Sequence, residues 1–162
     1  MTPTISSFTF EEVRERVTHA LDDFKKQDFQ LLELRADERA ATHRIACYLQ
    51  TYFPGWDVDC EYNRRGRDLK EQAGRLVRPD IIVHHRGIPE NLLCIEAKKE
   101  GELLDRDKEK LKKFTDPLGK DKYQFGLLLV LSLDAPYVIK GEWYQNGKMS
   151  QSVDFSNSQD AK

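Results

Sequence analysis

The sequence predicts an α/β fold in which a mixed β-sheet is flanked by α-helices. Two apolar, strand-like runs, 79–85 and 91–98, are joined by a short turn that contains Gly and Pro. A strongly charged helical segment, 103–114, follows, and then another apolar run over 123–133. A hairpin followed by a helical crossover to a further strand combines antiparallel and parallel neighbours in one sheet and places helices on its faces.

Two helices are expected before the sheet. Thr9 and Glu12 have the spacing of a capping box, and apolar residues then recur at helical period, so 10–26 is predicted as a packing helix. A second helix is predicted over 37–52 and is ended by Pro54-Gly55. This helix is the first element of the core region of the domain, which we expect to span about 37–144.

The remaining strands follow from alternation and turn signals. Segment 56–62 alternates and is predicted as the first strand, and 136–144 as the last. Between the first strand and the hairpin, the basic segment 63–78 is predicted as a long loop or a short irregular helix, and long loops in compact domains are often functional. His84 and His85 are neighbours on one strand and therefore face opposite ways, so they are not expected to share a metal ion.

Length and composition indicate one cytoplasmic domain. The 162 residues are 39% hydrophobic and 33% charged, and no apolar run approaches the roughly 20 residues of a membrane span. There is no signal-peptide pattern at the N-terminus, and the three cysteines are far apart. We expect a single domain over 1–149 and a polar tail, 150–162, that is disordered.

The charge of this chain is unevenly distributed. The net charge is only -2, yet 63–78 holds six Lys or Arg against two acids, and 106–122 holds seven against four. Such segments could face a phosphate backbone. They could equally be the solvated faces of a loop and a helix.

Asp80, Glu96 and Lys98 are the strongest candidates for a functional site. Asp80 heads one apolar strand, and Glu96 and Lys98 share one face of the next because strand side chains alternate. Carboxylates, with the Ala97 backbone carbonyl between the two functional side chains, are ligands suited to Mg²⁺. Lys98 would orient or deprotonate a water, or pair with a phosphate. The alternative is that Glu96 and Lys98 form an ion pair on an exposed sheet surface. However, charged side chains in strands this apolar lower the stability of the fold, so they are not expected there without a function.

Glu38 is a fourth candidate. It lies along the apolar stripe of the second helix and so points toward the sheet, where a buried carboxylate needs a partner. The alternative is that Glu38 only occupies the first helical turn, where negative charge favours the helix dipole.

These residues resemble a known family. Pro79-Asp80, fifteen intervening residues and Glu96-Ala97-Lys98 are similar to the motif of the PD-(D/E)XK, or restriction-endonuclease-like, nuclease superfamily, and Glu38 matches an acidic residue that many members carry before the sheet. The amino-acid sequences of Arg78–Val83 and Ile95–Lys98 look especially like the corresponding segments in nuclease domains of type I restriction subunits and related defence proteins. The resemblance covers 37–131.

The resemblance implies a mixed four- or five-stranded sheet and cleavage of DNA, less often RNA, by a Mg²⁺-dependent endonuclease, with Mn²⁺ as a substitute metal. Catalytic roles fall on Asp80, Glu96 and Lys98, and more weakly on Glu38. We expect Arg64, Arg65 and Lys99 to contact nucleic acid, and Gln124 to be an accessory residue. The protein would either cut with little sequence preference or depend on partners, such as a larger defence complex, for targeting. A homodimer would place two such sites on two strands. The alternative function is a catalytically silent module that binds nucleic acid or a partner on the same fold.

Overall fold

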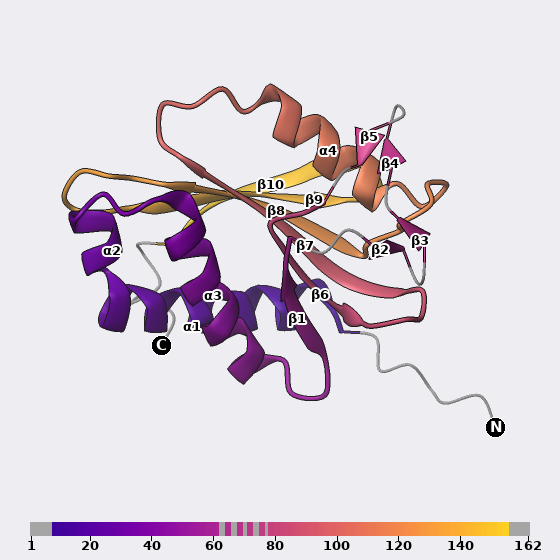
Figure 1. Cartoon of the computed structure of the whole chain (residues 1–162), viewed down its shortest axis with the longest axis horizontal. Coiled ribbons are helices and arrows are strands. Elements are labelled where there is room, and N and C mark those ends of the chain that lie inside the picture. Colours follow the sequence, from indigo (N-terminus) through magenta and orange to yellow (C-terminus); the bar gives the residue numbers. More distant parts are fainter. Residues whose placement is uncertain are drawn as a thin grey trace.

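The chain folds around one mixed, six-stranded β-sheet with the strand order β1-β6-β7-β8-β9-β10 (Figure 1). The computed structural model describes residues 8–61 and 78–155 and, between them, only the backbone of four two-residue strands. The helices are α1 (Phe10–Asp28), α2 (Gln30–Glu33), α3 (Glu38–Tyr52) and α4 (Asp105–Thr115). The strands of the large sheet are β1 (Asp57–Cys60), β6 (Ile81–His85), β7 (Glu90–Lys99), β8 (Phe125–Leu131), β9 (Ile139–Gln145) and β10 (Lys148–Asp154).

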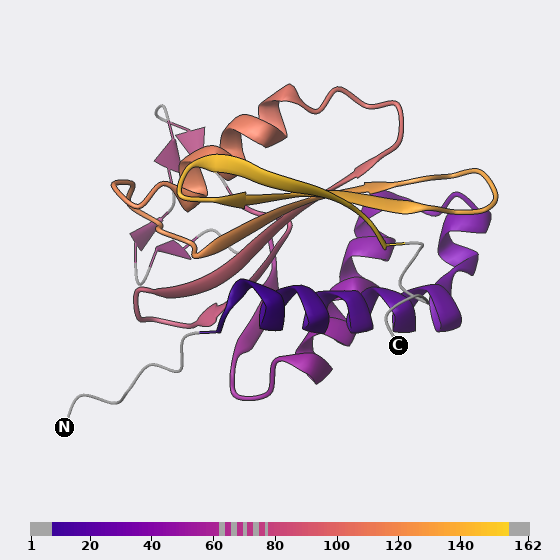
Figure 2. The ribbon, with the colours of Figure 1, turned by 180° about the vertical axis from the view of Figure 1, so that it is seen from behind.

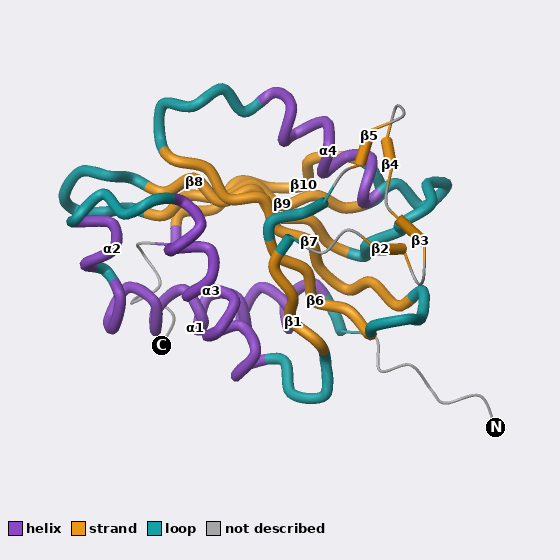
Figure 3. The backbone as a smooth tube through the Cα atoms, in the orientation of Figure 1, coloured by secondary structure: helices purple, strands orange, loops and turns teal. Residues whose placement is uncertain are grey.

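The helices cover both faces of the sheet. α1, α2 and α3 lie on one side and α4 on the other, as the views from front and back and the tube drawing all show (Figures 1, 2 and 3). The main hydrophobic core packs α1 and α3 against the sheet, and a second cluster joins Leu111 and Phe114 of α4 to Leu128 and Tyr144. The predicted α/β layer fold is confirmed.

The two long helices form where local signals predicted them. In α1 the Thr9 side chain accepts from the Glu12 backbone N–H, and the Glu12 side chain accepts from Thr9 N–H, which completes the predicted capping box. α3 is capped by Asp37, whose side chain accepts from the backbone N–H of Ala40.

The central hairpin and its crossover also match the prediction. β6 pairs antiparallel with β7, with Ile81 opposite Ile95, and β7 pairs parallel with β8 after the α4 crossover. β7 runs between β6 and β8 and is buried over most of its length. Its even-numbered residues from Cys94 to Lys98 therefore face α4, and its odd-numbered ones face α1 and α3.

β1 is an edge strand, and its acidic residues are paired. His84 Nε2 lies 2.7 Å from Asp59 Oδ2, and the Arg86 guanidinium donates to both Asp59 oxygens at 2.8 and 2.6 Å. The hydrogen bonds from Arg86 contribute most to holding the pKa of Asp59 below its ordinary value. His84 is therefore part of this cross-strand network.

Three expectations need correction. The predicted disordered tail is wrong for 150–155, because β10 pairs with β9 to Asp154 and Phe155 is buried in the core; residues 156–162 lie outside the described residues. The large sheet has six strands, not four or five. The predicted loop 63–78 contains short antiparallel backbone pairs, β2 (Arg64–Arg65) with β3 (Asp68–Leu69) and β4 (Glu71–Gln72) with β5 (Arg75–Leu76).

Within the described residues, no helix combines the length and the apolar character needed to cross a bilayer.

Replacing Phe155 with Ala tests the corrected C-terminus. The Phe155 side chain is only 2% exposed and packs against Gly141, where an added Cβ would lie 2.9 Å from its ring. We expect Phe155→Ala to lower the free energy of unfolding by about 3 kcal/mol in urea denaturation, because it empties a core position. The exposed Ser152→Ala in the same strand is the control, and equal stabilities of the two variants would contradict the placement of β10.

The Asp59 network predicts a pH-dependent contribution to stability. The folded-state pKa of Asp59 is depressed, so its charge stabilises the fold above its unfolded pKa of about 3.9, and this stability is lost as pH falls through the folded value. Asp59→Asn should therefore cost about 1–2 kcal/mol at pH 7. Denaturation curves from pH 7 to pH 3 should show the difference shrinking below about pH 4. A difference that stays constant to pH 3 would contradict this origin.

Candidate functional site

Four predicted residues converge at the end of β7. Asp80 comes immediately before β6, Glu96 and Lys98 lie on the α4-facing side of β7, and Glu38 is the first residue of α3. Extending the Ile81–Ile95 pairing by one residue places Asp80 opposite Glu96. Lys98 Nζ lies 3.9 Å from Glu38 Oε1. The hairpin register and the N-terminus of α3 thus bring the four side chains together.

Asp80 is held by the backbone of the neighbouring strand. Its Oδ2 accepts from Ala97 N–H at 2.8 Å, a position where an antiparallel ladder would continue. The residue that would face Ala97 in that ladder is Pro79, which has no N–H to donate. The Ala97 carbonyl therefore receives no ladder hydrogen bond from Pro79, and it remains suited to the metal-ligand role predicted for it.

Glu96 is a buried carboxylate whose loss of hydration is only partly offset by its neighbours. Its side chain is 1% exposed, and Lys110 Nζ of α4 lies 2.8 Å from its Oε1. Despite this short distance, Oε1 has no hydrogen-bond partner of acceptable geometry among the described residues. Burial raises the pKa of Glu96 well above its ordinary value, and the negative charge of Asp80 raises it further, while Lys110 opposes both. The carboxylates of Asp80 and Glu96 therefore repel each other, and a cation bound beside them would reduce this repulsion.

Lys98 lies between carboxylates from both layers of helices. Its Nζ is 3.9 Å from Glu38 of α3 and 4.0 Å from Asp107 of α4. Burial alone would lower the pKa of Lys98, but Asp107 and Glu38, with Asp80 and Glu102, outweigh it and raise the pKa. In this structure Lys98 is therefore a charged ammonium whose position is set from two sides.

Glu38 is partly buried, as its place on the helix stripe predicted. Desolvation raises its pKa, Lys98 lowers it, and Glu102 and Asp80 raise it, with a net upward shift. Glu38 therefore has the partner that a carboxylate on this stripe was expected to need, the Lys98 ammonium at 3.9 Å.

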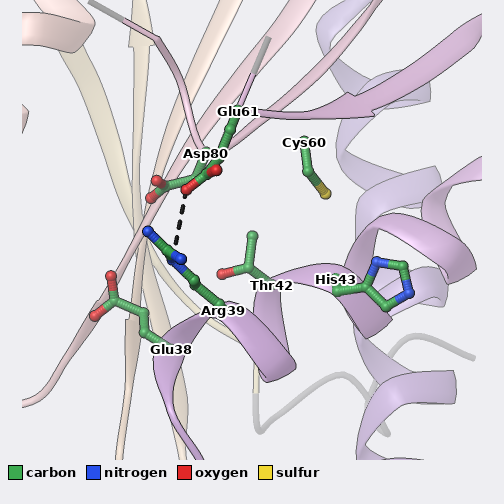
Figure 4. A pocket seen from close by; sticks show the side chains of 7 residues that line it. All are labelled: Glu38, Arg39, Thr42, His43, Cys60, Glu61 and Asp80. Carbon is green, nitrogen blue, oxygen red and sulfur yellow. Dashed lines mark ion pairs between the residues drawn. The ribbon is translucent and has the colours of Figure 1, made fainter.

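A cavity of about 260 Å³ opens beside Asp80 and Glu38. In Figure 4 the carboxylates of Asp80 and Glu61 lie together, and the Arg39 guanidinium lies between them and Glu38. Arg39 Nε is 3.7 Å from Glu61 Oε1. The rest of the lining comes from Thr42, His43 and Cys60. The site is thus open on the α3 side, where a substrate can approach the carboxylates.

The other predicted residues have different outcomes. Lys99 lines an open hollow beside Lys98 and Glu38, a place from which it can reach a ligand. Gln124 is not at the site: its backbone N–H donates to Asn91 O, near the opposite end of β7, and its position corresponds to four residues before Glu96. The structure does not bring Gln124 together with the other four residues, because the parallel register starts β8 far from the end of β7 that carries Glu96 and Lys98. The side chains of Arg64 and Arg65 lie outside the described residues.

Sequence reasoning missed the two charged residues that α4 contributes. Asp107 lies four residues before Leu111 and seven before Phe114, so it continues the buried stripe of the helix. This is the same pattern that singled out Glu38, and it was a usable signal. Lys110 carried no such signal, since it is one of several lysines on a highly charged helix.

The donor set fits a Mg²⁺ ion. No group of three or more His, Cys, Asp or Glu is arranged to hold a metal within 8–61 and 78–155. Mg²⁺ is commonly held by one or two carboxylates together with waters and substrate oxygens, and it does not need a complete protein cage. Asp80 and Glu96, with the Ala97 carbonyl, provide this smaller set, and the Lys110 ammonium 2.8 Å from Glu96 Oε1 shows that this carboxylate already attracts a cation.

Comparisons with known proteins found weak structural similarity and no sequence match. No protein-family model matches the chain, and no curated protein sequence matches it. Among solved structures, the cryo-electron microscopy structure of a DrdV–DNA complex is similar over 90% of this chain, with a TM-score of 0.47 and 16% sequence identity. This chain spans only 12% of the length of that one. We base no functional argument on a likeness at this level.

Neutralising Glu96 should stabilise the metal-free protein. Glu96→Gln removes a buried charge that faces Asp80, so the free energy of unfolding in EDTA at pH 8 should rise by about 1–2 kcal/mol. Urea denaturation of wild type and variant measures this. A loss of 3 kcal/mol or more, the cost of breaking a structural buried pair, would instead show that Glu96 and Lys110 exist to stabilise the fold.

Proposed function

We propose that this protein is a metal-dependent endonuclease of the PD-(D/E)XK superfamily that hydrolyses phosphodiester bonds of DNA. The observation that carries the proposal is the buried Glu96 carboxylate facing Asp80, with Lys98 two residues along the same strand face. A purely structural sheet has no reason to retain this combination at its centre, because each buried charge costs stability.

The proposed metal ion is Mg²⁺, with Mn²⁺ as a substitute. Asp80, Glu96 and the Ala97 carbonyl would hold it at the end of β7. When bound, it would lower the pKa of a coordinated water and neutralise charge that develops on the phosphoryl oxygens. The hydrogen bond from Ala97 N–H to Asp80 Oδ2 keeps that carboxylate oriented, and the burial of Glu96 excludes water from its far side.

Lys98 would act on the substrate. Glu38 and Asp107 hold its ammonium near the carboxylates, in position to pair with the scissile phosphate or to orient the attacking water. Glu38 is in this proposal a positioning residue, because it acts through Lys98.

The proposed substrate is DNA, with RNA as the alternative that an assay has to separate. The basic segment 63–78, with Arg64 and Arg65, and Lys99 would contact the phosphate backbone. The resemblance of the motif residues to defence nucleases suggests a cytoplasmic role in restriction or phage defence. Targeting would then come from partner subunits, and a homodimer would place two such sites on the two strands.

The second candidate is a catalytically silent binding module on the same fold. It is favoured by one observation: Lys110 Nζ already lies at Glu96 Oε1, where it supplies a positive charge to the carboxylate pair. A protein that never binds a metal would benefit from such a permanent cation.

Nuclease assays decide between the two. Supercoiled, linear and single-stranded DNA and RNA are incubated with Mg²⁺, Mn²⁺ or EDTA. We expect metal-dependent cleavage of DNA that falls about 10²–10⁴-fold in Asp80→Asn, Glu96→Gln and Lys98→Met, because each removes a ligand or a transition-state charge.

Gln124→Ala is the control, because Gln124 lies away from the site and should retain full activity. Cleavage that persists in EDTA or in Glu96→Gln would show that the nuclease site lies elsewhere. Binding of DNA by wild type without any cleavage or metal binding would favour the silent module.

A further inference from the structure

α4 carries a charge pattern complementary to that of β7. Glu96 and Lys98 lie two residues apart on one strand face, and Lys110 and Asp107 lie three apart on the helix above it. The pairs are matched by sign: Lys110 contacts Glu96 at 2.8 Å, and Asp107 lies 4.0 Å from Lys98. The helix therefore supplies a counter-charge to each of the two motif residues that β7 contributes.

Close packing fixes the height of α4 above the sheet. A Cβ at Gly126 of β8 would lie 3.0 Å from Thr115 Cγ2 and 3.2 Å from Leu111 Cδ2, so a larger residue there would force these α4 side chains to move by a few tenths of an ångström. The Thr115 hydroxyl donates to Leu111 O at 2.8 Å and turns its methyl toward the sheet. The backbone that carries Lys110 is thus firmly seated, while its long side chain can move.

We infer that Lys110 is a displaceable counter-ion, which holds the metal-free carboxylate pair together and has to leave Glu96 when the metal binds. The inference rests on the proposed metal site. It assigns to Lys110 a positioning role: it sets how much metal is needed to fill the site, and it does not itself act on the substrate.

Three features make the Lys110 contact suited to displacement. The side chain is 20% exposed, so its ammonium has a route to water. The contact is made by a single ammonium on a long stem and not by the rigid two-pronged fork of an arginine, so it fixes the carboxylate less firmly than an arginine would. A divalent ion held by the proposed ligands Asp80 and Glu96 would supply twice the positive charge of the Lys110 ammonium.

The experiment compares wild type, Lys110→Met and the matched control Lys113→Met, which removes an exposed lysine from the same helix. Mg²⁺ and Mn²⁺ affinities are measured by calorimetry at pH 8, and melting temperatures in EDTA and in saturating metal. In Lys110→Met we expect the Tm in EDTA to fall by about 4 °C, the deficit to close with metal, and metal affinity to rise about tenfold, as the thermodynamic cycle requires. Lys113→Met should match wild type in all three.

A second variant keeps the outcome interpretable if Lys110→Met does not fold. Lys110→Arg retains the positive charge, so its Tm in EDTA should stay at the wild-type value. Equal metal affinities and Tm values in Lys110→Met and Lys113→Met would overturn the inference and leave the proposed nuclease intact. So would a Tm deficit in Lys110→Met that metal does not close. No metal binding by wild type would instead remove the proposed function, and the inference with it.

Discussion

The structure is organised around one costly contact, the burial of the Glu96 carboxylate opposite Asp80 in the middle of a β-sheet. A carboxylate that is 1% exposed beside a second one is destabilising unless cations or donors surround it. The surroundings provide partial relief through the Ala97 N–H on Asp80 and the ammonium of Lys110 on Glu96. Incomplete compensation of this kind is typical of a site that awaits a ligand.

The two helical layers meet at this contact from opposite faces of the sheet. α3 brings Glu38 from one side and α4 brings Asp107 and Lys110 from the other, and all three reach the end of β7. Each helix is anchored by its apolar stripe, and the charged residue lies where that stripe passes the sheet's end. The same packing that stabilises the fold therefore also sets the electrostatics of the site.

Much of the fold was predictable because its signals are local. The capping box at Thr9, the two apolar runs of the hairpin with their Gly- and Pro-containing turn, and the apolar run of β8 are all patterns of neighbouring residues. The failures are non-local. Strand β10 looks like a polar tail because it is an edge strand, exposed on alternate residues, and only its pairing with β9 and the burial of Phe155 make it part of the sheet. The position of Gln124 away from the other four residues follows from the register of a parallel pair, which is not encoded in either strand alone.

The sequence by itself determined which residues share a strand face: Glu96 and Lys98 lie together because strand side chains alternate. The pairing of Asp80 with Glu96 was set by the folded hairpin, whose register shifts by one residue between Val83 and His84. Only the tertiary structure decided which counter-charges reach them. Lys110 is one of several lysines in α4, and its contact with Glu96 depends on how the crossover seats that helix, which Gly126 allows to pack closely on the sheet. Periodicity is a property of neighbouring residues, whereas the distance between an ammonium and a carboxylate 14 residues earlier depends on the packing of the whole layer.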